Sequence, residues 1–164
     1  MRKLRIYLDS SVIGDFDTPE DSERGTLTKE FFRHVQEFPD DYELLISPVV
    51  AAEVNACWEP KLSILIDFLE NLDCTWLPEN QEAMDLAETY VQHGVFGQKH
   101  IRDLTHIAYA VLARCDYIVS WNFKHLVNAM TMSRVNLFNQ ANNYCGVNIV
   151  PPFVITGENP YENA

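Results

Sequence analysis

The segment from Arg102 to Leu126 constrains the fold most, because an unusually apolar helix there leads through a turn into a short strand. Apolar side chains occupy most sides of this predicted helix, so it must lie between other elements of the fold. Asp103 stands at its start and heads a stripe with Ile107 and Ala110. Because an unpaired carboxylate is costly away from water, we expect a compensating group or ion beside Asp103.

Strand-like and helix-like segments alternate along the rest of the chain. Short apolar segments predict strands at residues 4–8, 42–46, 74–77, 117–120 and 147–150. Apolar side chains at three- and four-residue spacing predict helices over residues 26–38, 79–93 and 127–143, and from residues 48, 60 and 102 onward. This alternation predicts an α/β fold with a central parallel sheet of four to five short strands flanked by helices.

Length and composition predict one domain over residues 1–150, with an irregular tail over residues 151–164 that packs on this domain or extends from it. A chain of 164 residues has the usual size of one domain, and 47% hydrophobic residues supply a core. No apolar run reaches the roughly 18 residues of a membrane helix. The first apolar run ends at Asp9, too early for a secretory signal, so we expect a cytoplasmic protein.

The formal net charge of −12 limits the partners that the chain can bind. An acidic surface repels nucleic acid at long range and favours a basic partner, or simply keeps the protein in solution. Any chemistry on nucleic acid therefore needs local positive charge. The candidates for such a basic rim are Lys99, Arg102, Lys124, His125 and Arg134.

Polar side chains fall where an open parallel sheet binds ligands, beyond the carboxyl ends of its strands. Asp9 follows the first predicted strand and Asn122 follows the fourth. Glu53 lies in the helix after the second strand, and Asp103 lies in the helix that leads into the fourth. Carboxylate and amide oxygens suit Mg²⁺ or Mn²⁺, so we expect these residues to gather at one cation site.

Each of these residues also has a simpler interpretation. Asp9 could cap the segment that follows it, Asp103 could be a first-turn acid favoured by the helix dipole, and Glu53 could face solvent. Asn122 is of a residue type common in turns. His106, one turn after Asp103, is more simply a hydrogen-bonded core histidine than a neighbour of a cation ligand.

Three segments of the chain resemble the PIN domain family, and most closely the VapC-type toxins of toxin–antitoxin pairs. The segments are Asp9-Ser-Ser-Val-Ile, Pro48-Val-Val-Ala-Ala-Glu-Val, and the stretch from Asp103 to Leu126. The resemblance implies an endoribonuclease that depends on Mg²⁺ or Mn²⁺, with RNA as substrate, a cognate antitoxin as partner and a homodimer as assembly. By position it assigns Asp9, Glu53 and Asp103 as metal ligands.

Asn122 departs from the family pattern, in which the fourth catalytic position is usually Asp. An amide oxygen can still ligate a cation, but it brings no negative charge, so we expect weaker binding of a second metal or a role toward water or substrate. The catalytic set implied by the resemblance is Asp9, Glu53, Asp103 and Asn122. The alternative is a catalytically silent PIN-like module that binds a protein, which Asn122 and the net charge favour.

Overall fold

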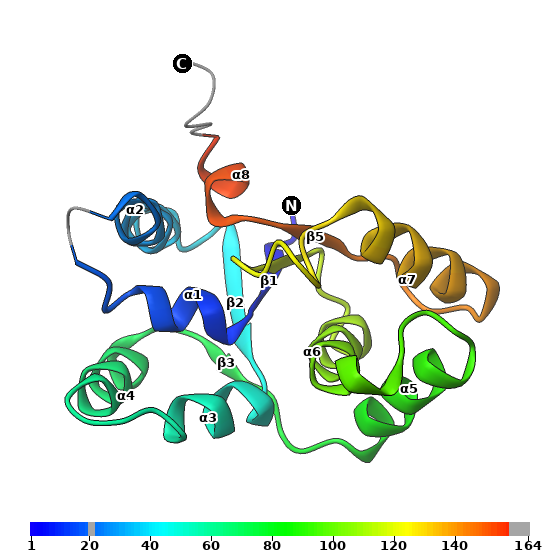
Figure 1. Cartoon of the computed structure of the whole chain (residues 1–164). Coiled ribbons are helices and arrows are strands. Elements are labelled where there is room, and N and C mark those ends of the chain that lie inside the picture. The colour runs from blue at the N-terminus through cyan, green and yellow to red at the C-terminus, as the bar shows by residue number, and fades with distance from the viewer. Residues whose placement is uncertain (20–21, 158–164) are drawn as a thin grey trace.

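The computed structural model describes residues 1–19 and 22–157, and within them the chain forms a five-stranded sheet in which every pairing is parallel (Figure 1). The spatial order is β3-β2-β1-β4-β5. The strands are β1 (Leu4–Leu8), β2 (Tyr42–Ile46), β3 (Thr75–Trp76), β4 (Tyr117–Val119) and β5 (Asn148–Val150). The predicted α/β fold with a parallel sheet is therefore confirmed.

Helices flank the sheet on both sides (Figure 1). One side carries α1 (Ser10–Asp15), α2 (Glu23–Glu37), α3 (Pro48–Asn55) and α4 (Lys61–Asn71). The other side carries α5 (Gln81–Gln92), η1 (Gln98–His100), α6 (Ile101–Leu112) and α7 (Ala129–Ala141). A last short helix, α8 (Pro152–Thr156), packs against α2. No helix in the described part of the chain is long and apolar enough to cross a bilayer.

The direction of the chain across the sheet reverses at β1, which has β2 on one side and β4 on the other. Leu8 of β1 is in register with Val119 of β4, so the residues that follow these two strands lie side by side. The backbone N–H of Asp9 donates to the Val119 carbonyl at 3.1 Å, which ties the two strand ends together. Such a switch point is where open α/β sheets bind ligands.

The apolar helix predicted from Arg102 onward is buried, as expected. Leu104, Ile107, Ala108 and Val111 of α6 are at most 3% exposed, and α6 packs against α5. Burying one such large aliphatic side chain is worth about 1.5–3 kcal/mol, so α6 is firmly held. This fixes the start of α6, and Asp103 with it, relative to the sheet.

Two short helices were not predicted. α1 has six residues, too few for a helical period to be visible in the sequence. The C-terminal tail was expected to be irregular, but residues 152–156 form α8, which begins with proline in the first turn, where its missing N–H costs nothing. The rest of the expected tail, residues 158–164, lies outside the described residues. Helix α2 also begins earlier than expected, because Ser22 accepts a capping hydrogen bond from the Gly25 N–H at 3.2 Å.

Candidate active site

All four predicted site residues line one cavity of about 440 Å³ at the carboxyl ends of the strands. Asp9 lies between β1 and α1, Glu53 in α3, Asp103 in the first turn of α6, and Asn122 in the loop after β4. The fold thus brings together side chains from four separate parts of the sequence. Their roles in catalysis and metal binding remain predictions.

Asp9 is held by two serine hydroxyls. Ser11 Oγ and Ser120 Oγ each donate to Asp9 Oδ2 at 2.7 Å, and the residue is 5% exposed. The side chain of Asp9 does not cap α1, so the simpler capping interpretation is wrong. Oδ2 takes both hydroxyl hydrogen bonds, and Oδ1 lies 3.6 Å from His106 Nε2.

A buried histidine connects Glu53 to Asp9. His106 is 1% exposed, and its Nε2 lies 2.7 Å from Glu53 Oε1 and 3.6 Å from Asp9 Oδ1. Its Nδ1 lies 2.7 Å from the hydroxyl oxygen of Tyr7. Burial alone would lower the pKa of His106, but the hydrogen bond with Glu53 and the charge of Asp9 raise it overall. His106 is thus a hydrogen-bonded core histidine, and it also contacts the predicted ligands.

Glu53 does not simply face solvent. Its Oε2 accepts a hydrogen bond from Ser10 Oγ while Oε1 contacts His106. Burial would raise the pKa of Glu53, but the hydrogen bond with His106 and other favourable contacts lower it overall. These contacts therefore favour the charged carboxylate form of Glu53.

Asp103 has weaker compensation than the other two acids. Burial raises the pKa of Asp103, the charge of Asp9 adds to this, and nearby histidines only partly offset it. Its side chain accepts a long hydrogen bond from Asn122, whose Nδ2 lies 3.5 Å from Asp103 Oδ1. The compensating group expected beside Asp103 is therefore only partly present among the described residues.

Asn122 turns its oxygen away from the acids. Asn122 Oδ1 accepts the His125 backbone N–H at 3.0 Å, which closes a turn of the loop after β4. The simpler interpretation of Asn122 as a turn residue is thus correct. Its amide group faces Asp103 as a donor, not as a cation ligand.

The positive charge around the cavity differs from the predicted basic rim. Arg102 lines the cavity, but Lys99, Lys124, His125 and Arg134 do not. Arg24 and Lys61 line it instead, from α2 and α4. Arg24 pairs with Asp15 at 2.8 Å, whereas Lys61 has no ion-pair partner among the described residues. No motif marks these cations, because only the packing of α2 and α4 brings them to the site.

A second group of potential ligands adjoins Asp103. One nitrogen each of His100 and His125 and one oxygen of Asp103 all lie within 4.8 Å of one another. His100 was not predicted from the sequence, and His125 was predicted only as part of a basic rim. The available signal was the position of His100 three residues before Asp103, on the same side of a helical turn.

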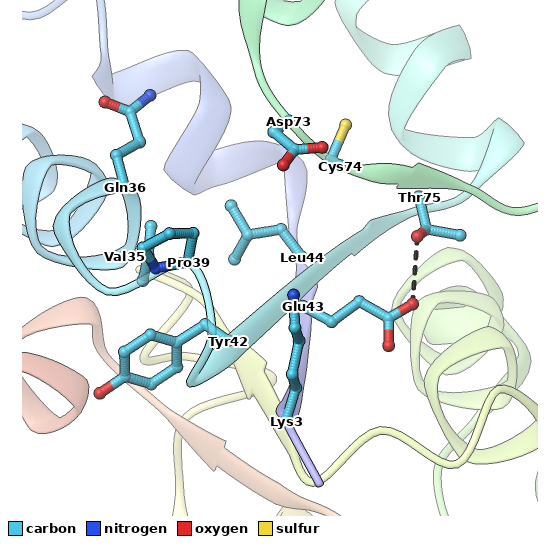
Figure 2. Close-up of a pocket in the computed structure, with 10 residues that line it drawn as sticks. All are labelled: Lys3, Val35, Gln36, Pro39, Tyr42, Glu43, Leu44, Asp73, Cys74 and Thr75. Atoms are coloured by element: carbon cyan, nitrogen blue, oxygen red, sulfur yellow. Dashed lines mark hydrogen bonds between the residues drawn. The ribbon is translucent and has the colours of Figure 1, made fainter.

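A second, larger cavity contains none of the predicted site residues. It measures about 500 Å³ and lies at the amino ends of β2 and β3 (Figure 2). Glu43, the acid at its centre, accepts a hydrogen bond from Thr75 and pairs with Arg5, so its charge is already compensated. Position at the carboxyl ends of the strands and uncompensated charge both favour the smaller cavity as the functional site.

The donor types of the smaller cavity suit a hard divalent cation, although the carboxylate oxygens of Asp9, Glu53 and Asp103 do not all lie within 4.8 Å of one another. Asp9, Glu53 and Asp103 offer only carboxylate oxygens, the ligands that Mg²⁺ and Mn²⁺ prefer. The raised pKa of Asp103 reflects burial and like charge, both of which a cation would relieve.

No protein-family model and no curated protein matches the sequence. Among solved structures, FitAcB from Neisseria gonorrhoeae matches with a TM-score of 0.54 and 16% sequence identity, covering 90% of this chain and 98% of that chain. Identity this low shows the fold alone. The chain therefore has a PIN-like fold, as its sequence resemblance implied.

Proposed function

We propose that this protein is an endoribonuclease that depends on Mg²⁺ or Mn²⁺ and serves as the toxin of a type II toxin–antitoxin pair. The observation that carries the proposal is the convergence of Asp9, Glu53 and Asp103 on one cavity at the switch point of the sheet. The resemblance of three sequence segments to VapC-type toxins supports the toxin–antitoxin assignment, and the fold shared with FitAcB agrees with it.

The chain's own residues would prepare the three acids for a cation. Ser11 and Ser120 hold Asp9 in one orientation, and such hydrogen bonds to ligands typically change metal affinity or activity 10- to 100-fold. Ser10 and His106 orient Glu53 in the same way. When bound, a divalent cation supplies Lewis-acid polarisation of the phosphodiester and lowers the pKa of a water molecule.

Lys61 and Arg102 would attract the RNA backbone to an otherwise acidic protein. Both line the cavity, so their charge lies beside the acids where a phosphate must sit. The net charge of −12 discourages RNA binding elsewhere on the surface and suits a basic segment of an antitoxin. We also propose a homodimer, which light scattering of the purified chain would test.

The test of the proposed activity is RNA cleavage by the purified chain with Mg²⁺, with Mn²⁺ and with a chelator, for wild type and Asp103→Asn. We expect cleavage only by wild type with a cation. The variant removes one of several clustered negative charges, so its melting temperature in chelator should be no lower than that of wild type. Equal cleavage by the folded variant would refute the assignment.

A catalytically silent PIN-like module is the second candidate, and one observation favours it. His106 already places an imidazole between Glu53 and Asp9, and Asn122 offers no ligand oxygen. This module would bind an antitoxin-like protein while cleaving no RNA. The same assay separates the two: no cleavage and no saturable uptake of Mg²⁺ or Mn²⁺ by wild type would establish the silent module.

A further inference from the structure

We propose that His100, Asp103 and His125 form a second cation site, which takes a transition-metal ion of the Zn²⁺ and Co²⁺ class in preference to Mg²⁺. The three ligand atoms lie within 4.8 Å of one another, and all three residues are partly buried. Asp103 is common to this site and to the acidic site, but the two histidines are not. The proposal therefore stands whether or not the protein cleaves RNA.

The two imidazole rings are brought together by separate elements. His100 ends η1 directly before α6, and His125 lies in the loop after β4. Their ring centroids are 4.5 Å apart, and His100 Nδ1 lies 3.9 Å from Asp103 Oδ2. The His100 side chain is only 15% exposed, and its ring packs edge-on against Phe96 with centroids 5.4 Å apart.

The position of His125 is fixed by its backbone. Asn122 Oδ1 accepts its N–H at 3.0 Å, and Thr131 Oγ1 donates to its carbonyl at 2.7 Å. These contacts hold the backbone of His125 where its ring packs against the ring of His100. Asn122 thus acts as a positioning residue for this site.

In the described part of the chain, the ring nitrogens of the histidine pair lack the hydrogen bonds that hold His106. His106 has partners for both ring nitrogens, Tyr7 and Glu53. Within residues 1–19 and 22–157, by contrast, neither ring nitrogen of His125 has a hydrogen-bond partner, and His100 contacts Asp103 only beyond hydrogen-bond distance. Two imidazoles and a carboxylate left open toward one another are the ligands of a metal ion.

The donor types determine which metal fits. Two imidazole nitrogens and one carboxylate oxygen match three-ligand zinc sites, which keep a fourth position open for water, and they bind late first-row ions most tightly. Mg²⁺ demands six oxygens in a rigid octahedron, so it gains little from imidazole. With bonds of about 2.0–2.1 Å, a tetrahedral ion spaces its ligand atoms roughly 3.4 Å apart, so the rings have to close slightly on binding.

Co²⁺ provides the test, because its visible absorption reports nitrogen ligands and low coordination number directly. The full-length protein, freed of metal with a chelator, is titrated with Co²⁺ as wild type, His100→Ala, His125→Ala and His93→Ala. His93 is an exposed histidine outside the cluster and serves as the matched control. We expect one absorbing Co²⁺ in wild type and His93→Ala, and an affinity at least about 10-fold lower in the other two variants.

Competition and resonance measurements complete the test. Zn²⁺ should displace Co²⁺ at stoichiometric amounts and Mg²⁺ should not, even in large excess. If a variant fails to fold, imidazole NMR of wild type replaces it, and Zn²⁺ should shift the signals of His100 and His125 but not of His93. Unchanged Co²⁺ spectra in both folded variants, or Zn²⁺ shifts elsewhere than in this pair, would overturn the proposal.

Discussion

The acidic residues at the two edges of the sheet differ in how their charge is compensated. At the amino edge two acids each have an arginine of their own: Glu43 pairs with Arg5 at 2.5 Å, and Asp116 pairs with Arg2 at 2.6 Å. At the carboxyl edge Asp9 and Glu53 share the single imidazole of His106, and Asp103 lies beside them.

This difference distinguishes acids that stabilise the fold in ion pairs from acids that are available to bind a ligand. The charges of Glu43 and Asp116 are compensated by these arginines, so neither acid needs a ligand. At the carboxyl edge, burial and the negative charge of Asp9 raise the pKa of Asp103, and nearby histidines only partly offset this. We interpret this incompletely compensated carboxylate as the place of a cation, and matched substitutions at the two edges test the contrast.

The largest effect is expected from removing one acid at each edge. Asp9→Asn should lower the rate of RNA cleavage roughly 10²- to 10³-fold, the usual loss when one electrostatic group of a catalytic site is removed. Glu43→Gln, the matched change at the amino edge, should leave the rate unchanged. Single-turnover cleavage with Mn²⁺ measures both. A comparable loss in the two variants would remove the distinction between the edges.

The next effect concerns the side chain that compensates acids at each edge, which is His106 at the carboxyl edge and Arg5 at the amino edge. His106→Leu removes one hydrogen-bond partner each from Glu53 and Tyr7, which keep Ser10 and Ser47, so it should lower the free energy of unfolding by about 1–3 kcal/mol. Added Mn²⁺ should restore part of this stability, because it supplies positive charge to the same acids. Arg5→Leu at the amino edge should also destabilise, but without rescue.

Urea denaturation with Mn²⁺ and with chelator measures both variants. Rescue of Arg5→Leu to the same extent, or no rescue of His106→Leu, would contradict the contrast.

A smaller effect is expected on RNA binding. Lys61 lines the carboxyl-edge cavity and Lys3 lines the amino-edge cavity, so the two lysines form a matched pair. In the inactive Asp103→Asn background, Lys61→Gln should weaken RNA binding and reduce the slope of log K against log salt by about 0.7, the value for one phosphate of a single strand. Lys3→Gln should change neither. Fluorescence anisotropy at several NaCl concentrations decides between these outcomes.

The smallest effect is a pH dependence at the amino edge. The hydrogen bond from Arg2 lowers the pKa of Asp116 in the folded protein, despite some burial. A lowered pKa stabilises the fold above the unfolded pKa of about 3.9, and this contribution is lost as pH falls through the folded value. Asp116→Asn should therefore melt slightly below wild type at pH 7. The gap should close on acidification, and a gap that widens instead would refute this sign.

Much of the fold could be predicted because its strands are short apolar segments between clear turn residues. The acids could be predicted because Asp9 directly follows a strand and Glu53 interrupts an apolar run. Helices α1 and α8, with six and five residues, are too short to show a period.

The remaining parts of the site depend on tertiary packing. Lys61 reaches the cavity only because α4 packs beside α3. His100 meets His125 only because the loop after β4 folds back over the start of α6. The orientation of the Asn122 amide follows from a local turn that its residue type allows but does not dictate.

The most direct test of the central claim is to locate the cation itself. A crystal of the protein soaked in Mn²⁺ should give an anomalous peak at the carboxyl edge, within bonding distance of Asp9 and Asp103. The amino-edge cavity beside Glu43 should give none. Saturating Mn²⁺ with no peak near Asp9, Glu53 and Asp103 would contradict the account.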